Sequence, residues 1–74
     1  MMHDTRISLL DVVALLVDKP DKGLVAGHVG TVVEVGPANT LLVEFINPEG
    51  QTFALRELKH DELLVLKHEP VAAL

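Results

Sequence analysis

The chain has 74 residues with six Lys and Arg against eleven Asp and Glu, so its formal charge is −5. A chain of this length accommodates one domain, and we assign residues 1–74 to it. The acidic balance makes nucleic acid an unlikely partner, and the absence of cysteine excludes disulfides, thiolate metal ligands and cysteine nucleophiles.

Turn-forming residues divide the chain at short and nearly regular intervals. Between them lie β-branched and leucine-rich segments of strand length, a pattern typical of a small all-β barrel or sandwich. The five expected strands are residues 11–17, 31–35, 40–46, 51–55 and 63–66. A polar stretch before the last strand, Lys59 to Glu62, predicts a short helical turn.

The first of these segments is ambiguous between strand and helix. Apolar residues from Leu9 to Val17 recur at helical spacing, and Ser8 to Asp11 has the form of a capping box. The β-branched pair Val12 and Val13 favours a strand, and Pro20 ends the run after strand length. We therefore predict a strand, with the helix as the alternative.

Two tight turns predict the central hairpins. In Asn47-Pro48-Glu49-Gly50, Asn takes the first position, Pro the position with φ fixed near about −65°, and Gly the position where φ becomes positive. This order is typical of a type I turn with a following bulge. In Gly36-Pro37-Ala38-Asn39, we expect Pro37 to preset the corner and Asn39 to be left-handed.

The order of these elements resembles an SH3-like barrel: a strand, a long first loop, two tight hairpins, a short polar turn and a closing strand. Four segments also resemble a family of small bacterial proteins, common in cyanobacteria and known as a domain of unknown function. These segments are Leu10-Asp11-Val12-Val13, Gly27-His28-Val29-Gly30-Thr31-Val32-Val33-Glu34-Val35, Val43-Glu44-Phe45 and Gly50-Gln51-Thr52. The resemblance covers about residues 9–66. It implies a barrel fold and no established activity, and His28 departs from a position that is often acidic in that family.

The segment from Gly27 to Val32 is also similar to the KOW element of ribosomal and transcription-factor barrels, which bind RNA or protein. The favoured role of Gly27 and Gly30 is structural, because glycine adopts positive φ and lets the loop enter the strand without a Cβ clash. The alternative is a direct ligand contact through the backbone. The basic and aromatic neighbours that RNA-binding KOW elements carry are absent around His28 and Glu34.

Residues suited to catalysis or metal binding form no recognisable arrangement in the sequence. Ser8 is the only serine, and no base accompanies it. Glu34 and Glu44 could face each other across the second hairpin, although polar outward faces of the strands explain them more simply. Metal-ligand spacing is missing among the four histidines, His3, His28, His60 and His68. We expect no catalytic residue, no cofactor and no metal, and hence no enzyme.

Apolar residues exceed what the core of a small barrel requires. In the first strand Val12, Ala14 and Leu16 alternate with Val13, Leu15 and Val17, so both sides are apolar. An apolar outer face marks an interface. The candidate partner-binding residues are Val13, Leu15, Val17, Leu42, Ile46 and His28. The alternative is that residues 1–10 and 71–74 fold back and cover this face within one molecule.

The sequence thus predicts a non-enzymatic protein-binding module that associates with itself, with a homodimer as the first expectation. One alternative is the antitoxin or immunity-type partner of a basic toxin protein, because a small acidic chain suits a neutralising partner. Another is an RNA- or ribosome-associated barrel of KOW type. We expect no membrane partner and a cytoplasmic location. The longest strongly apolar stretch, Val12 to Val17, is far shorter than the roughly 20 residues of a membrane helix, and no secretory signal pattern is present.

Overall fold

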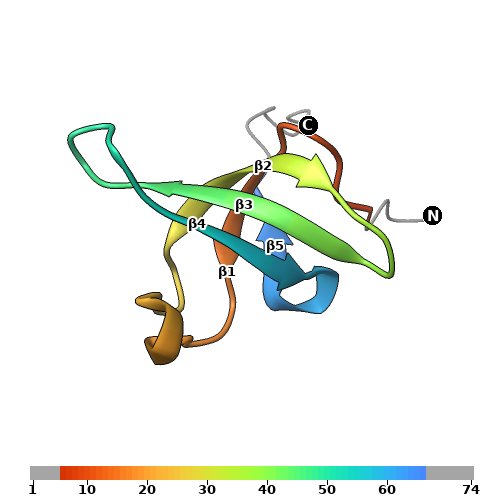
Figure 1. Ribbon diagram of the computed structural model, residues 1–74, viewed down its shortest axis with the longest axis horizontal. Helices are drawn as coiled ribbons and strands as arrows, with labels where there is room; N and C mark the ends of the chain where they lie inside the picture. The colour runs from red at the N-terminus through yellow and green to blue at the C-terminus, as the bar shows by residue number, and fades with distance from the viewer. Residues whose placement is uncertain (1–5, 67–74) are drawn as a thin grey trace, which may run out of the picture.

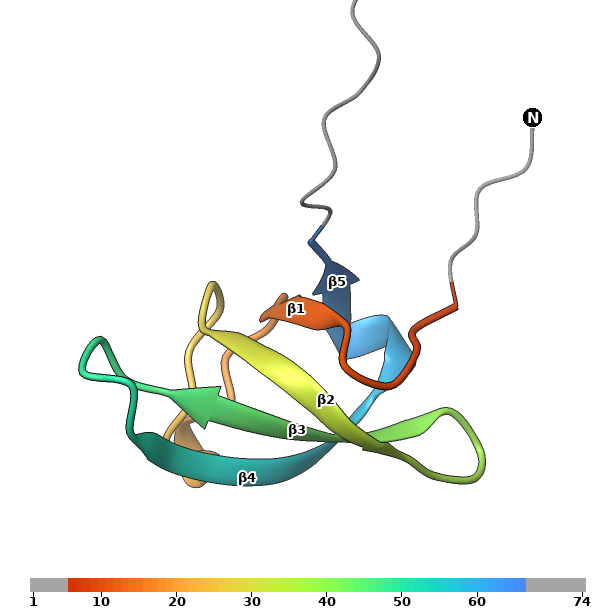
Figure 2. The same ribbon diagram turned by 90° about the horizontal axis from the view of Figure 1, so that it is seen from above.

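The computed structural model describes residues 6–66, which form one antiparallel sheet in the strand order β4-β3-β2-β1-β5. The elements are β1 (Val12–Leu15), η1 (Pro20–Lys22), β2 (Val29–Val35), β3 (Thr40–Ile46), β4 (Thr52–Lys59), η2 (His60–Glu62) and β5 (Leu63–Val65). β2 crosses the molecule, with β3 and β4 on one side of it and β1 and β5 on the other (Figures 1 and 2). This arrangement confirms the predicted all-β fold with five strands.

The first predicted strand is confirmed, because β1 pairs with two neighbours. Val13 lies opposite Gly30 of β2 on one side and opposite Val65 of β5 on the other. The Ser8 to Asp11 segment forms a turn instead of a helix start: the Asp11 carboxylate accepts the Ser8 backbone N–H at 2.8 Å, and Leu10 is left-handed with φ 70°. The capping-box pattern in the sequence therefore corresponds to a local turn and not to the start of a helix.

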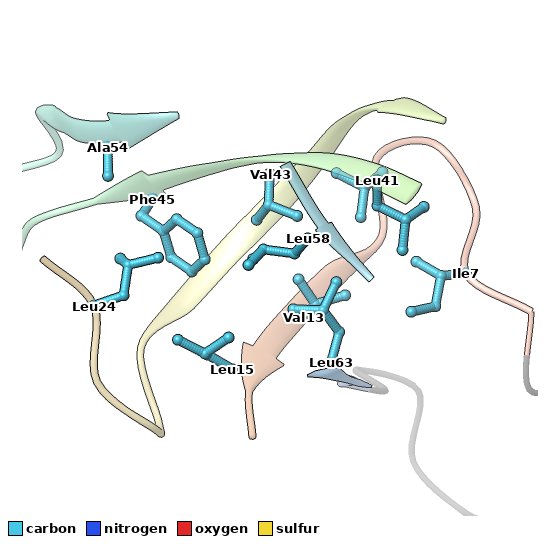
Figure 3. Close-up of a cluster of buried hydrophobic side chains, with 11 residues drawn as sticks. Ile7, Val13, Leu15, Leu24, Leu41, Val43, Phe45, Ala54, Leu58 and Leu63 are labelled. Atoms are coloured by element: carbon cyan, nitrogen blue, oxygen red, sulfur yellow. The ribbon is translucent and has the colours of Figure 1, made fainter. Parts of the chain in front are cut away.

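The core lies between the two halves of the bent sheet, as Figure 3 shows. Alternate residues of each strand point into it, because successive side chains of a strand face opposite sides. The cluster consists of Ile7, Val13, Leu15, Leu24, Val32, Leu41, Val43, Phe45, Ala54, Leu58 and Leu63. Burial of each large aliphatic side chain stabilises the fold by about 1.5–3 kcal/mol.

The burial of β1 corrects part of the expected partner-binding surface. Val13 and Leu15 are 0% and 1% exposed, so they belong to the core and not to an outer face. Both faces of β1 are apolar in sequence, and the alternation alone does not say which face turns inward. The bend of the sheet packs the face of β1 that carries Val13 and Leu15 against the core cluster, and Val12 and Ala14 take the outer, half-buried positions.

The turn between β3 and β4 has the predicted form. Gly50 has φ 83°, and its N–H donates to the Asn47 carbonyl at 2.9 Å. The Asn47 Oδ1 accepts the backbone N–H groups of Glu49 at 3.1 Å and Gln51 at 2.9 Å. One asparagine side chain therefore holds the whole turn.

The turn between β2 and β3 differs from the prediction in one respect. Asn39 is left-handed with φ 63° as expected, but Ala38 is left-handed as well, with φ 55°. Two successive residues with positive φ make a type I′ turn, whose twist matches that of the flanking strands. Pro37 precedes this pair instead of forming the corner, and its carbonyl accepts the Thr40 backbone N–H at 3.1 Å.

β4 extends beyond its predicted end, while the helical turn after it is confirmed. β4 pairs with β3 as far as Lys59 opposite Thr40, because Glu57 and Lys59 occupy outer positions of the sheet and still complete the backbone ladder. At the start of η2 the Glu62 carboxylate accepts the backbone N–H of Lys59 at 2.9 Å, which satisfies a backbone donor at the beginning of the turn.

Candidate partner-binding face

An apolar strip crosses the outer face of the sheet. The strand pairing places Leu64 opposite Ala14, and Ala14 opposite Val29. Gly30 pairs with Phe45, so the next residues outward on the two strands, Val29 and Ile46, lie beside each other. Phe53 of β4 completes the strip at a bulge in the β3–β4 ladder. We name Leu64, Ala14, Val29, Ile46 and Phe53 the apolar strip. The four large side chains of this strip are about half exposed: Leu64 is 52% exposed, Val29 47%, Ile46 51% and Phe53 44%.

One end of the apolar strip forms an open groove of about 630 Å³. It is lined by Gly27, His28, Val29, Ile46, Asn47, Pro48 and Phe53. The loop before β2, the end of β3 and the hairpin into β4 therefore build it together. Apolar and aromatic lining with few polar groups is typical of sites that receive an apolar side chain.

The His28 side chain is fixed against the groove from two sides. Its ring meets Phe53 edge-on, with centroids 5.5 Å apart and an angle of 69° between the planes. Its Nδ1 accepts the backbone N–H of Val25 at 3.2 Å, so the proton of the neutral imidazole is on Nε2. The ring centroid of Phe53 in turn lies 6.4 Å from that of Phe45 in the core. The groove wall is therefore anchored to the core.

Carboxylates occupy the outer face beside the groove. Glu44 of β3 lies between Thr31 and Leu55, and in the next row Leu42 lies between Glu34 and Glu57. We name Glu34, Glu44 and Glu57 the acidic cluster. The Thr52 hydroxyl donates to the Glu44 Oε2 at 3.1 Å.

Glu34 and Glu44 do not lie opposite each other, and the preferred interpretation as polar outward residues agrees with their positions. A bulge between Val32 and Glu34 shifts the β2–β3 register, so Glu34 pairs with Leu42 and Glu44 pairs with Thr31. The two carboxylates lie on the same face in neighbouring rows.

The structure divides the six predicted partner-binding residues among four environments. His28 and Ile46 line the groove. Leu42 is half-buried between two carboxylates of the acidic cluster, and Val17 is exposed beyond the end of β1. Val13 and Leu15 are core residues, as described above. Of the six predicted residues, His28 and Ile46 are therefore the two that the structure brings together, in the groove.

Sequence reasoning missed Val29, Pro48 and Phe53 as groove residues. Phe53 carried the clearest signal, because it is one of only two aromatic residues in the chain and lies next to Ala54, whose side chain points to the opposite face of the strand. Its approach to His28 depends on the β3–β4 bulge, which nothing in the sequence marks.

A second hollow, of about 300 Å³, lies near the turn between β2 and β3. Its polar lining comes from Arg6, Ser8, Asn39, Thr40 and His60. Sequence analysis treated Ser8 and His60 separately, whereas they border the same hollow. The Thr40 hydroxyl there donates to the Pro37 carbonyl at 2.6 Å. Ile7, Val35 and Leu41 also line this hollow, so its character is mixed and more polar than that of the groove.

An ion pair connects the loop after β1 to η2. The Lys19 ammonium donates a hydrogen bond to the Glu62 carboxylate, and both side chains are partly buried. This bond is the main cause that lowers the pKa of Glu62, and the Lys59 backbone N–H lowers it further. The same bond raises the pKa of Lys19. The pair has a structural role, because it holds η2 against the first loop.

Two classes of site are not found in the part of the chain that the structure describes. Residues 6–66 contain no group of three or more His, Asp and Glu side chains that could hold a metal ion. Over the same range, no helix has the length and apolar character to span a membrane. His3 and His68 lie outside the described residues, as do most of the terminal segments considered as a cover for the outer face.

Fold and site together define a small antiparallel β-domain whose outer face combines an apolar groove with a carboxylate cluster. The family model described as Domain of unknown function (DUF4926) matches residues 9–65, and the chain belongs to that family. This result confirms the resemblance to a small domain-of-unknown-function family. No curated protein and no solved structure matches the chain.

Proposed function

We propose that this protein is a non-enzymatic protein-binding module with an SH3-like barrel, and that the outer face of its sheet is the interface. The apolar strip is the observation that carries the proposal, because contiguous exposed apolar side chains mark interaction sites. Each large side chain left in water forgoes about 1.5–3 kcal/mol of burial, a substantial loss for a small domain. A partner that covers the strip recovers this free energy.

Self-association is the first use that we propose for this surface, through its β5 end. β5 is an edge of the sheet, and an edge strand offers backbone groups that can pair with a second chain. The exposed Leu64 and Leu16 and the half-buried Ala14 lie around this edge. A two-fold symmetric pairing of two β5 edges would bury them. The acidic cluster lies on β2, β3 and β4, so such a dimer keeps like charges apart.

Light scattering at micromolar concentration tests this proposal. We expect a mass above the 8.0 kDa of one chain and a decrease toward 8.0 kDa for Leu64→Glu. Leu55→Glu is the matched control, because Leu55 is similarly exposed on β4, away from the β5 edge. A mass of 8.0 kDa at every concentration contradicts self-association.

The acidic cluster favours a second candidate, the neutralising partner of a basic protein. Glu34 and Glu57 flank Leu42 on the outer face, and Glu44 lies in the row beside them. Opposite charge on a partner accelerates association and selects against acidic surfaces. This second candidate is tested by co-purification with a basic protein encoded by a neighbouring gene. We expect the unmodified chain to co-purify with that protein and a variant of the acidic cluster not to.

A further inference from the structure

The groove adjoins a carboxylate on the same strand. Ile46 lines the groove, and Glu44 lies two residues earlier on β3, which places it about 7 Å along the same face. The Glu44 carboxylate accepts the Thr52 hydroxyl at 3.1 Å, which restricts its orientation and leaves further acceptor positions open. An apolar pit and an oriented anion are therefore neighbours on one strand.

Carboxylates predominate on the outer face of β2, β3 and β4 around this pair. Glu34 and Glu57 flank Leu42, two residues before Glu44. Lys59, opposite Thr40 at the far end of β4, is the cation of this face, and no Lys or Arg lines the groove. A second copy that presented the same face would set carboxylates against carboxylates, which is unfavourable. The face is complementary to a cationic partner.

We propose, resting on the protein-binding function above, that the groove receives an apolar side chain from a cationic protein segment. A Lys or Arg two residues away in that segment pairs with Glu44. In an extended segment, side chains two residues apart share a face at the spacing that separates Ile46 from Glu44. Arginine suits the site best, because its guanidinium binds a carboxylate through two parallel hydrogen bonds. Further cations of the segment face Glu34 and Glu57.

A display library of random dodecapeptides, selected on the immobilised full chain, tests this inference. We expect the enriched peptides to share Leu, Ile or Phe two residues from Arg or Lys. Fluorescence anisotropy of an enriched peptide then measures its affinity, which we expect to weaken as salt concentration rises.

Two variants separate the two halves of the proposed site. Glu44→Gln removes the charge and keeps the shape, and we expect it to weaken the peptide about tenfold. Val29→Thr keeps the shape of a groove residue and adds a hydroxyl, and we expect a clear loss of affinity as well. Asp61→Asn is the matched control, because it makes an equal charge change in η2, outside the groove lining, and should leave affinity within about twofold. Circular dichroism of each variant confirms that the sheet is intact.

The possible outcomes are distinct. Enriched peptides without cations, or affinity that Glu44→Gln does not change, overturn the inference. A library that yields no binder overturns it too, while a dimer in light scattering would then leave the proposed protein-binding function in place. A monomer that binds the cationic peptides contradicts self-association and supports the inference.

Discussion

Gly30 and Gly50 are both required by the fold, for different physical reasons. Gly30 does not have positive φ, but a Cβ there would lie 2.7 Å from the Glu44 carbonyl oxygen and 2.7 Å from the Val43 Cγ1. Gly50 has open space around it and φ 83°, a conformation that costs other L-residues about 1–2 kcal/mol. One glycine is needed for close strand packing and the other for turn geometry.

This difference predicts how the same substitution affects stability at each of the two glycines. Gly30→Ala should lower the free energy of unfolding by about 1–3 kcal/mol, because a backbone oxygen in the β2–β3 ladder cannot move aside without breaking its pairing. Gly50→Ala should cost about 1 kcal/mol through backbone strain. Thermal melts at equal protein concentration measure both effects.

Asparagine distinguishes the causes, because it tolerates the left-handed conformation and still carries a Cβ. Gly50→Asn should therefore melt close to the unmodified chain, while Gly30→Asn should be at least as destabilised as Gly30→Ala. Equal melting of the unmodified chain and Gly30→Ala would refute the close approach of β2 to β3.

Individual residues were predictable where one local rule decides their conformation. The left-handed Asn39 and the Asn47 to Gly50 turn follow from residue type alone. The burial of Val13 and Leu15 did not follow, because β1 is apolar on both faces and only the tertiary packing across the bent sheet decides which face is covered. The left-handed Ala38 was equally out of reach, since alanine carries no preference for positive φ.

At the scale of elements, the Lys19–Glu62 pair couples the first loop to the turn before β5. The pKa of Glu62 is lowered from its ordinary 4.5, first by the Lys19 hydrogen bond and then by the Lys59 backbone N–H. A carboxyl group with a lowered pKa in the folded state contributes stability that is complete above its unfolded pKa and is lost as pH falls through the folded one. The pKa of Lys19 is raised above 10.5 by the Glu62 hydrogen bond, so its contribution is complete below that value and is lost at higher pH.

This linkage predicts the behaviour of Glu62→Gln. The variant should melt at lower temperature than the unmodified chain at about pH 7. The difference should shrink as pH falls below 4.5, the unfolded pKa, and should vanish only below the lowered folded pKa, where the carboxylate is protonated in both states. Melts across this range measure the convergence. Glu57→Gln is the control, since Glu57 is exposed on the acidic cluster, and it should show no such convergence. A constant difference between the Glu62 variant and the unmodified chain at all pH values would contradict the role of the ion pair.

The strands themselves were predictable because turn residues separate them and β-branched residues fill them. The register of the strand pairs was harder to predict from the sequence. The bulges between Val32 and Glu34 and between Phe45 and Ile46 change which side chains are neighbours, and no residue type marks either one. They explain why Glu34 does not oppose Glu44 and why Phe53 reaches His28 to complete the groove. The groove is thus a property of the sheet and not of any single segment.

For the whole molecule, the distribution of charge decides between partner classes. The outer face of β2, β3 and β4 carries the acidic cluster, and the Lys19 charge is paired with Glu62. Arg56 directs one guanidinium nitrogen to its neighbour's carbonyl, the Leu55 oxygen, at 3.1 Å. These positions give no continuous cationic surface along the described strands.

We therefore predict that the protein does not bind RNA or DNA usefully at physiological salt. Association with nucleic acid is driven largely by the release of counterions from phosphates that Lys and Arg neutralise, and six cations against eleven anions leave little such release. Fluorescence anisotropy with mixed-sequence RNA and DNA oligonucleotides checks this. A salt-dependent dissociation constant tighter than about 10⁻⁶ M would contradict the prediction and favour the KOW-type alternative. Glu44→Gln should leave oligonucleotide binding undetectable even though it removes one anion from the face, because it supplies no cation to neutralise phosphate, while it weakens binding of a cationic peptide.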